Sequence, residues 1–142
     1  MKMKSLPAFP LVRLAPAEPI LIIVPVISSA FSFCSPLERM LAMRQAIGRT
    51  GKIFEGLSGL STTNNLLTIR NLFYALKPQR TLEIGLCHGG SCLVFTSCHR
   101  DLKRPPAHQH LSLDPFQTSV WDDAGLMIVE QAGLSGWLDC RS

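Results

Sequence analysis

The residues best placed for chemistry lie between positions 82 and 91, in the sequence LEIGLCHGGS. Gly85 and Gly89 have no Cβ atom, so the backbone can bend sharply there and approach a ligand closely. The loop and the first turn of a following helix offer N–H groups without intrahelical acceptors. Glu83 precedes the loop, and its carboxylate would attract an ammonium group and repel a pyrophosphate. The stretch therefore predicts a turn that binds a ligand.

A second carboxylate, Asp114, ends the segment HLSLDPF at 110–116, which we expect to form a strand. A carboxylate at the end of such a strand can accept hydrogen bonds from both hydroxyls of a ribose. Asp114 follows Gly85 by 29 residues, whereas dinucleotide-binding folds place this residue about 20 positions on. The excess falls in the loop at 100–109, which contains two prolines and where insertion costs little.

These residues require alternating strands and helices to position them. We expect a buried strand at 80–85, a tight loop at 86–90, a helix at 91–99 and the strand at 110–116. A helix at 120–131 follows, with Ser119 and Asp122 as a capping box and Gly133 at its end, and a third strand opens at 136–142. This alternation predicts an α/β fold with parallel strands and right-handed crossovers, the N-terminal half of a doubly wound sheet.

Two helices are expected before the sheet, in a helical lead-in at 37–79. Ser35 can cap the first helix, Pro36 suits its first position, and Gly48 can end it. The spacing of Leu37, Met40, Leu41, Arg44 and Ile47 is helical. The stretch at 56–65 is typical of a loop, and a second helix is expected at 65–76 with one apolar face formed by Leu66, Ile69, Phe73 and Leu76.

Residues 1–36 form an apolar, proline-rich extension before these elements. Positions 19–37 are 19 uncharged residues, which is within the range of roughly 17–25 that spans a bilayer. Pro25 and four serines weaken this interpretation, and the charged start of the chain is too far from the apolar run for a signal peptide. We expect a buried or poorly ordered extension, with a membrane anchor at 19–37 as the alternative.

The glycine spacing separates two classes of nucleotide-binding turn. Nicotinamide and flavin binders use G-x-G-x-x-G, but this chain has Gly85-x-x-x-Gly89-Gly90 preceded by Glu83. The pattern E-x-G-x-x-x-G resembles the first motif of class I S-adenosylmethionine-dependent methyltransferases, and Asp114 resembles their second-strand acidic residue. LEIG followed by GGS, D-P-F and A-G-L is similar to the small-molecule O-methyltransferase group. The resemblance covers residues 56–142 and implies a Rossmann-like domain at 80–142.

The resemblance implies S-adenosylmethionine as cofactor, with its methionine part against the turn and its ribose facing Asp114. The implied cofactor-binding residues are Glu83, Gly85, Cys87, Gly89, Gly90, Ser91 and Asp114. The methyl group would pass to a small-molecule acceptor, with catalysis by positioning and by a general base where the acceptor loses a proton. Family members have about seven strands, so the sequence predicts a form truncated after the start of the third strand, with an exposed sheet edge through which copies associate. Catalytic residues are not assigned.

Each assignment has a plainer alternative. Glu83 can pair with Arg80 or Arg100, Gly89 and Gly90 can simply start a helix, and Asp114 can cap the turn before Pro115. His88 is a weak candidate for a catalytic base, and His99, His108 and His110 are expected on the surface. The protein as a whole can instead be a non-catalytic nucleotide-binding or scaffolding remnant, or be tethered to a membrane.

Charge and cysteine content bear on partners and compartment. The chain has 14 Lys and Arg against 10 Asp and Glu, and its basic residues are spread singly with one Tyr, so no nucleic-acid partner is expected. The five cysteines include no C-x-x-C pair, which argues against a disulfide framework and favours the cytoplasm. Cys92 and Cys98 would lie about 240° apart around a helix, so no metal site is expected from Cys87, His88, Cys92, Cys98 and His99.

Overall fold

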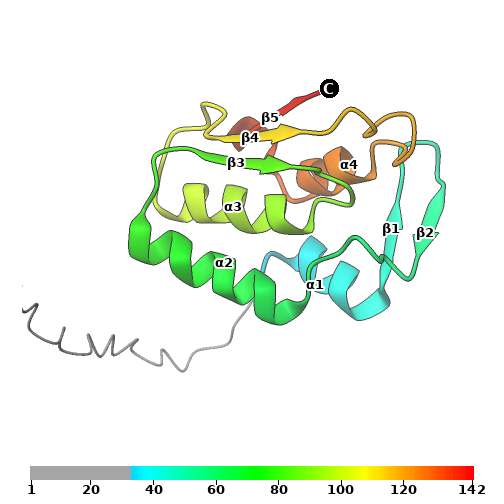
Figure 1. The fold of residues 1–142 in the computed structure, drawn as a ribbon, viewed down its shortest axis with the longest axis horizontal. Helices are drawn as coiled ribbons and strands as arrows, with labels where there is room; N and C mark the ends of the chain where they lie inside the picture. The colour runs from blue at the N-terminus through cyan, green and yellow to red at the C-terminus, as the bar shows by residue number, and fades with distance from the viewer. Residues whose placement is uncertain (1–32) are drawn as a thin grey trace, which may run out of the picture. The chain divides into compact units, whose positions relative to one another are not determined.

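A parallel three-stranded sheet with four α-helices organises residues 33–142, the part of the chain that the computed structural model describes (Figure 1). The elements are α1 (Ser35–Met43), β1 (Gln45–Ile47), β2 (Ile53–Glu55), α2 (Thr63–Leu76), β3 (Thr81–Ile84), α3 (Gly90–Asp101), β4 (His110–Leu113), α4 (Ala124–Gln131), a 3₁₀ turn η1 (Ser135–Trp137) and β5 (Leu138–Arg141). The α/β prediction is confirmed at this level.

The sheet has the order β3-β4-β5, and both neighbouring pairs are parallel. Glu83 of β3 aligns with Ser112 of β4, and Ser112 aligns with Cys140 of β5. Helix α3 connects β3 to β4 and lies beneath the sheet in Figure 1, with α2 packed against it on the side away from the strands. The carboxyl ends of β3 and β4 therefore meet at one edge, as the sequence predicts.

The first helix ends earlier than the helical spacing predicts. Its last residue is Met43, because Arg44 adopts a left-handed conformation with φ 52° and donates from Nη2 to the Gly56 carbonyl at 2.8 Å. Residues 45–47 then pair with 53–55 in an antiparallel hairpin, so Ile47 lies on a strand and is exposed. The cap residue is Cys34 and not Ser35, although Pro36 does occupy the first turn.

The second helix agrees well with its prediction. The Thr62 hydroxyl accepts a hydrogen bond from Asn65 N at 3.2 Å and caps it. Leu66 and Phe73 are buried. Leu76 is exposed, contrary to expectation, because the helix ends there and Lys77 turns left-handed with φ 47°.

Helix α4 begins at Ala124, four residues later than predicted, and the expected capping box does not form. Asp122 and Asp123 have φ values of 47° and 56°, outside the helical region. Asp122 Oδ2 instead accepts hydrogen bonds from Thr50, and Asp123 pairs with Arg49, so both carboxylates hold the hairpin. Gly133, with φ 67°, follows the helix as expected.

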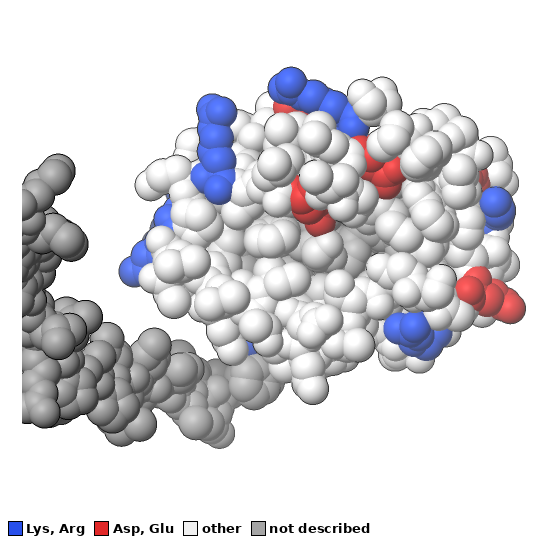
Figure 2. All heavy atoms as spheres, in the orientation of Figure 1, with Lys and Arg blue, Asp and Glu red and all other residues white. Residues whose placement is uncertain are grey.

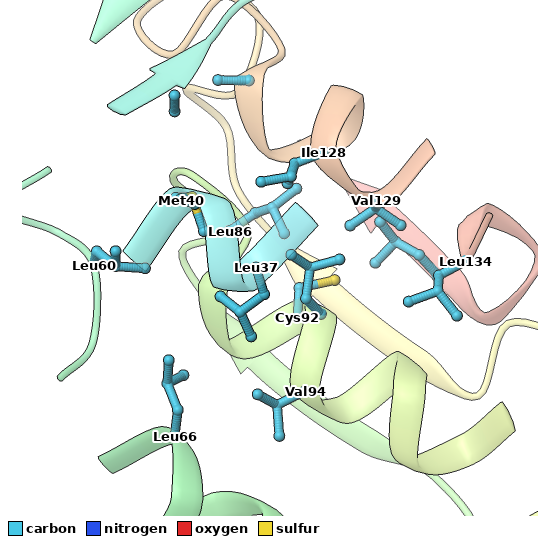
Figure 3. Packing of buried hydrophobic residues seen from close by; sticks show 14 of the residues in the cluster. Leu37, Met40, Leu60, Leu66, Leu86, Cys92, Val94, Ile128, Val129 and Leu134 are labelled. Carbon is cyan, nitrogen blue, oxygen red and sulfur yellow. The ribbon is translucent and has the colours of Figure 1, made fainter. Parts of the chain in front are cut away.

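The hydrophobic core lies between the helices (Figure 3). Leu37 and Met40 from α1, Val94 from α3 and Val129 from α4 are buried there. The face of β3 and β4 that α3 covers is polar by contrast, because it presents Thr81, Glu83, His110 and Ser112. Leu138 of β5, on the same face, belongs to the core.

The opposite sheet face carries apolar side chains. Leu82 is 57% exposed, Ile84 84% and Leu113 37%. The prediction that β3 is a buried strand is therefore wrong for alternate residues of the strand, because the apolar ones point away from α3. Among the described residues, the face of β3 and β4 away from α3 is therefore apolar and exposed.

Charged residues of both signs lie on the surface of the described part of the chain. Lys and Arg side chains are spread over the face shown in Figure 2, with Asp and Glu among them. Among the described residues, no helix is both long and apolar enough to cross a membrane. Residues 1–32, and with them most of the candidate anchor at 19–37, lie outside the described part.

Candidate functional site

The predicted binding turn joins β3 to α3. Gly85 has φ 88° and is exposed, and a Cβ atom built on it would meet nothing within 4 Å. The Gly85 amide donates to the Leu113 carbonyl at 2.9 Å, which ties the turn to β4. The surface directly over Gly85 is therefore open to solvent.

Asp114 stands beside this turn and is only 3% exposed. Its Oδ2 accepts from Cys87 N at 2.8 Å and from Gln117 Nε2 at 3.1 Å, and its Oδ1 accepts from Phe116 N at 2.9 Å. Burial alone would raise the pKa of Asp114, but these hydrogen bonds together outweigh it and hold the pKa below its ordinary value. Asp114 thus both joins the two strand ends and caps the turn that follows Pro115.

Gln117 is a member of this site that the sequence analysis missed. It is 4% exposed, and its Nε2 donates to Cys87 O at 2.9 Å while its Oε1 accepts from Gly125 N at 3.0 Å. The amide therefore links the turn to the start of α4. Its position three residues after Asp114, within the same turn, is the signal that could have identified it.

Gly89 and Gly90 are buried, and both are close to other parts of the chain. A Cβ atom on Gly89 would lie 2.8 Å from Ile128 Cγ2 and 3.0 Å from Gly125 O, and one on Gly90 would collide with Leu60. Close packing is thus a sufficient reason for both glycines. The open approach for a ligand is at Gly85.

The Glu83 side chain is 9% exposed and points to the face covered by α3. Its Oε2 accepts from Ser91 Oγ at 2.6 Å, and its Oε1 lies 3.0 Å from His110 Nε2. The structure thus connects Glu83 to the binding turn through Ser91, and the partners considered from sequence, Arg80 and Arg100, are not the ones it contacts.

His99 and His110 are fully buried, so the expectation that they lie on the surface is wrong. The Thr81 hydroxyl bridges them, at 3.0 Å from His99 Nε2 and 2.9 Å from His110 Nδ1. Arg104 Nη1 approaches His99 Nδ1 at 2.8 Å. Burial, and then the charge of Arg104, lowers the pKa of His99 to about 4, so this ring is neutral near pH 7.

Cys87 and His88 form a neutral pair in the turn. Cys87 Sγ lies 3.1 Å from His88 Nδ1, and the imidazole packs edge-on against Phe54 and Trp121. Burial raises the pKa of the Cys87 thiol and lowers that of His88. The thiol is therefore not activated as a nucleophile, and the imidazole is neutral near pH 7.

Comparison with known proteins does not assign the chain to a family. No protein-family model matches the chain, and no curated protein matches it either. The methyltransferase resemblance thus depends on the residues of the turn and on Asp114.

Proposed function

We propose that residues 80–142 form the N-terminal half of a Rossmann-like domain that binds S-adenosylmethionine for methyl transfer to a small-molecule acceptor. The observation that carries the proposal is the junction of two strand ends: the open, left-handed Gly85 turn and the ionised Asp114, joined through Cys87 N at 2.8 Å. Ligands of open α/β sheets bind at this edge.

The methionine part of the cofactor occupies the space over Gly85, where no side chain intervenes. A carboxylate offers about four acceptor positions, and four donors approach Asp114, from the backbone of Leu86, Cys87 and Phe116 and from the Gln117 side chain. A ribose hydroxyl therefore replaces one of these donors, and the turn at 115–117 moves to admit it. Glu83 supports the turn through Ser91.

Two matched glycines provide the test. Gly85 and Gly51 have φ values of 88° and 87°, both are exposed, and a Cβ on either meets nothing within 4 Å. Alanine at either position costs a similar backbone strain, on the order of 1 kcal/mol. Only the Gly85→Ala methyl group enters the proposed ligand space.

We therefore expect equilibrium dialysis of the full chain to show binding of S-adenosylmethionine and S-adenosylhomocysteine, weakened about tenfold or more by Gly85→Ala. Gly51→Ala should lower the melting temperature equally and leave affinity unchanged. No binding by the wild type at millimolar ligand, or equal affinities for the two variants, would contradict the proposal.

The orientation of Glu83 favours one alternative, a plain nucleoside ligand. Its carboxylate points to α3 and contacts Ser91 and His110, so the attraction for an ammonium group expected from sequence is weakened. In the same dialysis, adenosine that binds as tightly as S-adenosylmethionine would support this non-catalytic nucleoside site.

A further inference from the structure

We propose that Glu83, Cys92 and His110 form a buried binding site for a transition-metal ion of the zinc(II) type, between the sheet and α3. One donor atom from each residue, a carboxylate oxygen, a thiol sulfur and an imidazole nitrogen, lies within 4.8 Å of the other two. This inference goes beyond the proposed cofactor site and does not depend on it.

The fold brings these residues together from three elements. Glu83 and His110 lie on the neighbouring parallel strands β3 and β4, on the face that α3 covers. Cys92 comes from the first turn of α3, directly over them. Cys92 and His110 are fully buried, and the Glu83 side chain is 9% exposed. The three donors are therefore shielded from solvent.

Two of the three donor atoms have no hydrogen-bond partner. Glu83 Oε1 and His110 Nε2 are both buried without a hydrogen bond, although they lie 3.0 Å apart and would form an ion pair if the imidazole were protonated. Ser112 Oγ, on β4 opposite Glu83 in the register, is also buried without a hydrogen bond. An unsatisfied buried polar atom costs about 1–3 kcal/mol, so a ligand that binds these atoms would remove that cost.

A shared ion would bind both of these unpartnered atoms. Zinc bonds to nitrogen and oxygen are about 2.0–2.1 Å long, which separates two ligand atoms of a tetrahedral ion by roughly 3.3 Å. The observed 3.0 Å between Oε1 and Nε2 is close to this separation. Both atoms would then point at the ion and not at each other.

The donor set and its surroundings favour zinc over magnesium or calcium. Thiolate, imidazole and carboxylate are zinc ligands, whereas the alkaline-earth ions take oxygen ligands alone. The outer atoms of two ligands are already held: Thr81 Oγ1 binds His110 Nδ1 at 2.9 Å, and Ser91 Oγ binds Glu83 Oε2 at 2.6 Å. Such outer contacts orient metal ligands in proteins, and three protein ligands leave a fourth position for water.

The site can be tested on the full chain with zinc and cobalt(II) alone. Wild-type protein should bind one equivalent of either metal, measured by plasma mass spectrometry after dialysis, and cobalt should show a thiolate charge-transfer band. Cys92→Ser should bind at least 100-fold more weakly and lose the band. Cys98→Ser is the matched control, because Cys98 is equally buried on α3 but lies outside the cluster.

His110→Gln and His99→Gln form a second matched pair, since both rings are fully buried and only His110 belongs to the cluster. A wild-type chain that retains no metal, or a Cys92→Ser variant that binds as tightly as wild type, would overturn the proposal. X-ray absorption of the wild-type zinc complex needs no variant. It should show one sulfur at about 2.3 Å with nitrogen and oxygen ligands, and a spectrum with no sulfur or with two would equally overturn the proposal.

Discussion

The carboxylate of Asp114 offers the sharpest test of how the two strand ends are joined. In Asp114→Asn the side chain keeps its shape, but one oxygen that accepts a backbone N–H becomes an NH₂ group. With the amide oxygen facing Phe116 N, the NH₂ group would face Cys87 N, which now donates to Asp114 Oδ2 at 2.8 Å. Cys87 N then loses its acceptor, at about 1–3 kcal/mol, and Gln117 Nε2 keeps only its bond to Cys87 O. The remaining bond loses its charge, at about 1 kcal/mol more, so we expect a total loss of about 2–4 kcal/mol.

Urea unfolding followed by circular dichroism measures this loss, with Asp139→Asn as the control. Asp139 pairs with the exposed Arg141 at the surface, and its variant should leave stability close to that of wild type because exposed ion pairs contribute little. A folded pKa below the ordinary 3.8 means that ionised Asp114 stabilises the fold above pH 3.8, and that this contribution is lost as pH falls through the lower folded value. The gap between wild type and Asp114→Asn should therefore close in acid. A variant within about 0.5 kcal/mol of wild type at pH 7 would refute the reasoning.

Three further changes have defined outcomes. The folded pKa of His99 is about 4 against an ordinary 6.5, so wild-type stability should fall by up to about 3 kcal/mol between pH 6.5 and 4, and His99→Gln should flatten that slope in urea titrations. Gly125→Ala places a methyl 2.6 Å from Cys87 O, and thermal unfolding should show a loss of about 1–3 kcal/mol despite better helix propensity. Ile84→Thr should change stability by less than about 0.5 kcal/mol and raise the concentration at which light scattering detects association.

Contrary results are equally specific. An unchanged acid slope in His99→Gln would mean that another group titrates. A Gly125→Ala variant more stable than wild type would mean that the turn relaxes away from α4. An Ile84→Thr variant that associates as readily as wild type would remove the apolar sheet face as the cause.

Local sequence signals predicted β3, β4 and α2 well, but they did not predict the β1–β2 hairpin inside the expected helical lead-in. Period, glycine and proline positions located β3, β4 and α2 within a few residues, because these signals act over a single turn or strand. The end of α1 and the start of α4 were misplaced because they depend on distant partners. Arg44 leaves the helix to bind Gly56, and Asp122 binds Thr50 across the chain. The hydrophobic pattern of the sequence cannot predict such contacts between distant residues.

The structure brings together only some of the predicted site residues, because the other contacts also depend on residues distant in sequence. The turn and Asp114 are neighbours, as strand order requires. The burial of His110 was missed because alternation in β3 and β4 places polar residues inward and apolar ones outward, the reverse of what hydrophobicity predicts. His99 lies on α3, and its burial was missed because its partner Thr81 is on this inward face of β3. Gln117 was missed because its three hydrogen bonds to Cys87, Asp114 and Gly125 form only when the turn folds back.

The polar residues of β3 that face α3, Thr81 and Glu83, affect the alignment of this strand with β4. Shifting β3 by one residue would turn Leu82 and Ile84 toward the core and expose Thr81 and Glu83, and burial of apolar surface alone favours that slipped pairing. The contacts of Thr81 with two imidazoles and of Glu83 with Ser91 exist only in the native alignment. These polar residues thus specify the register of β3, although burial of its apolar residues favours the slipped one. Replacing both with leucine would remove this preference, and β3 would then populate two registers.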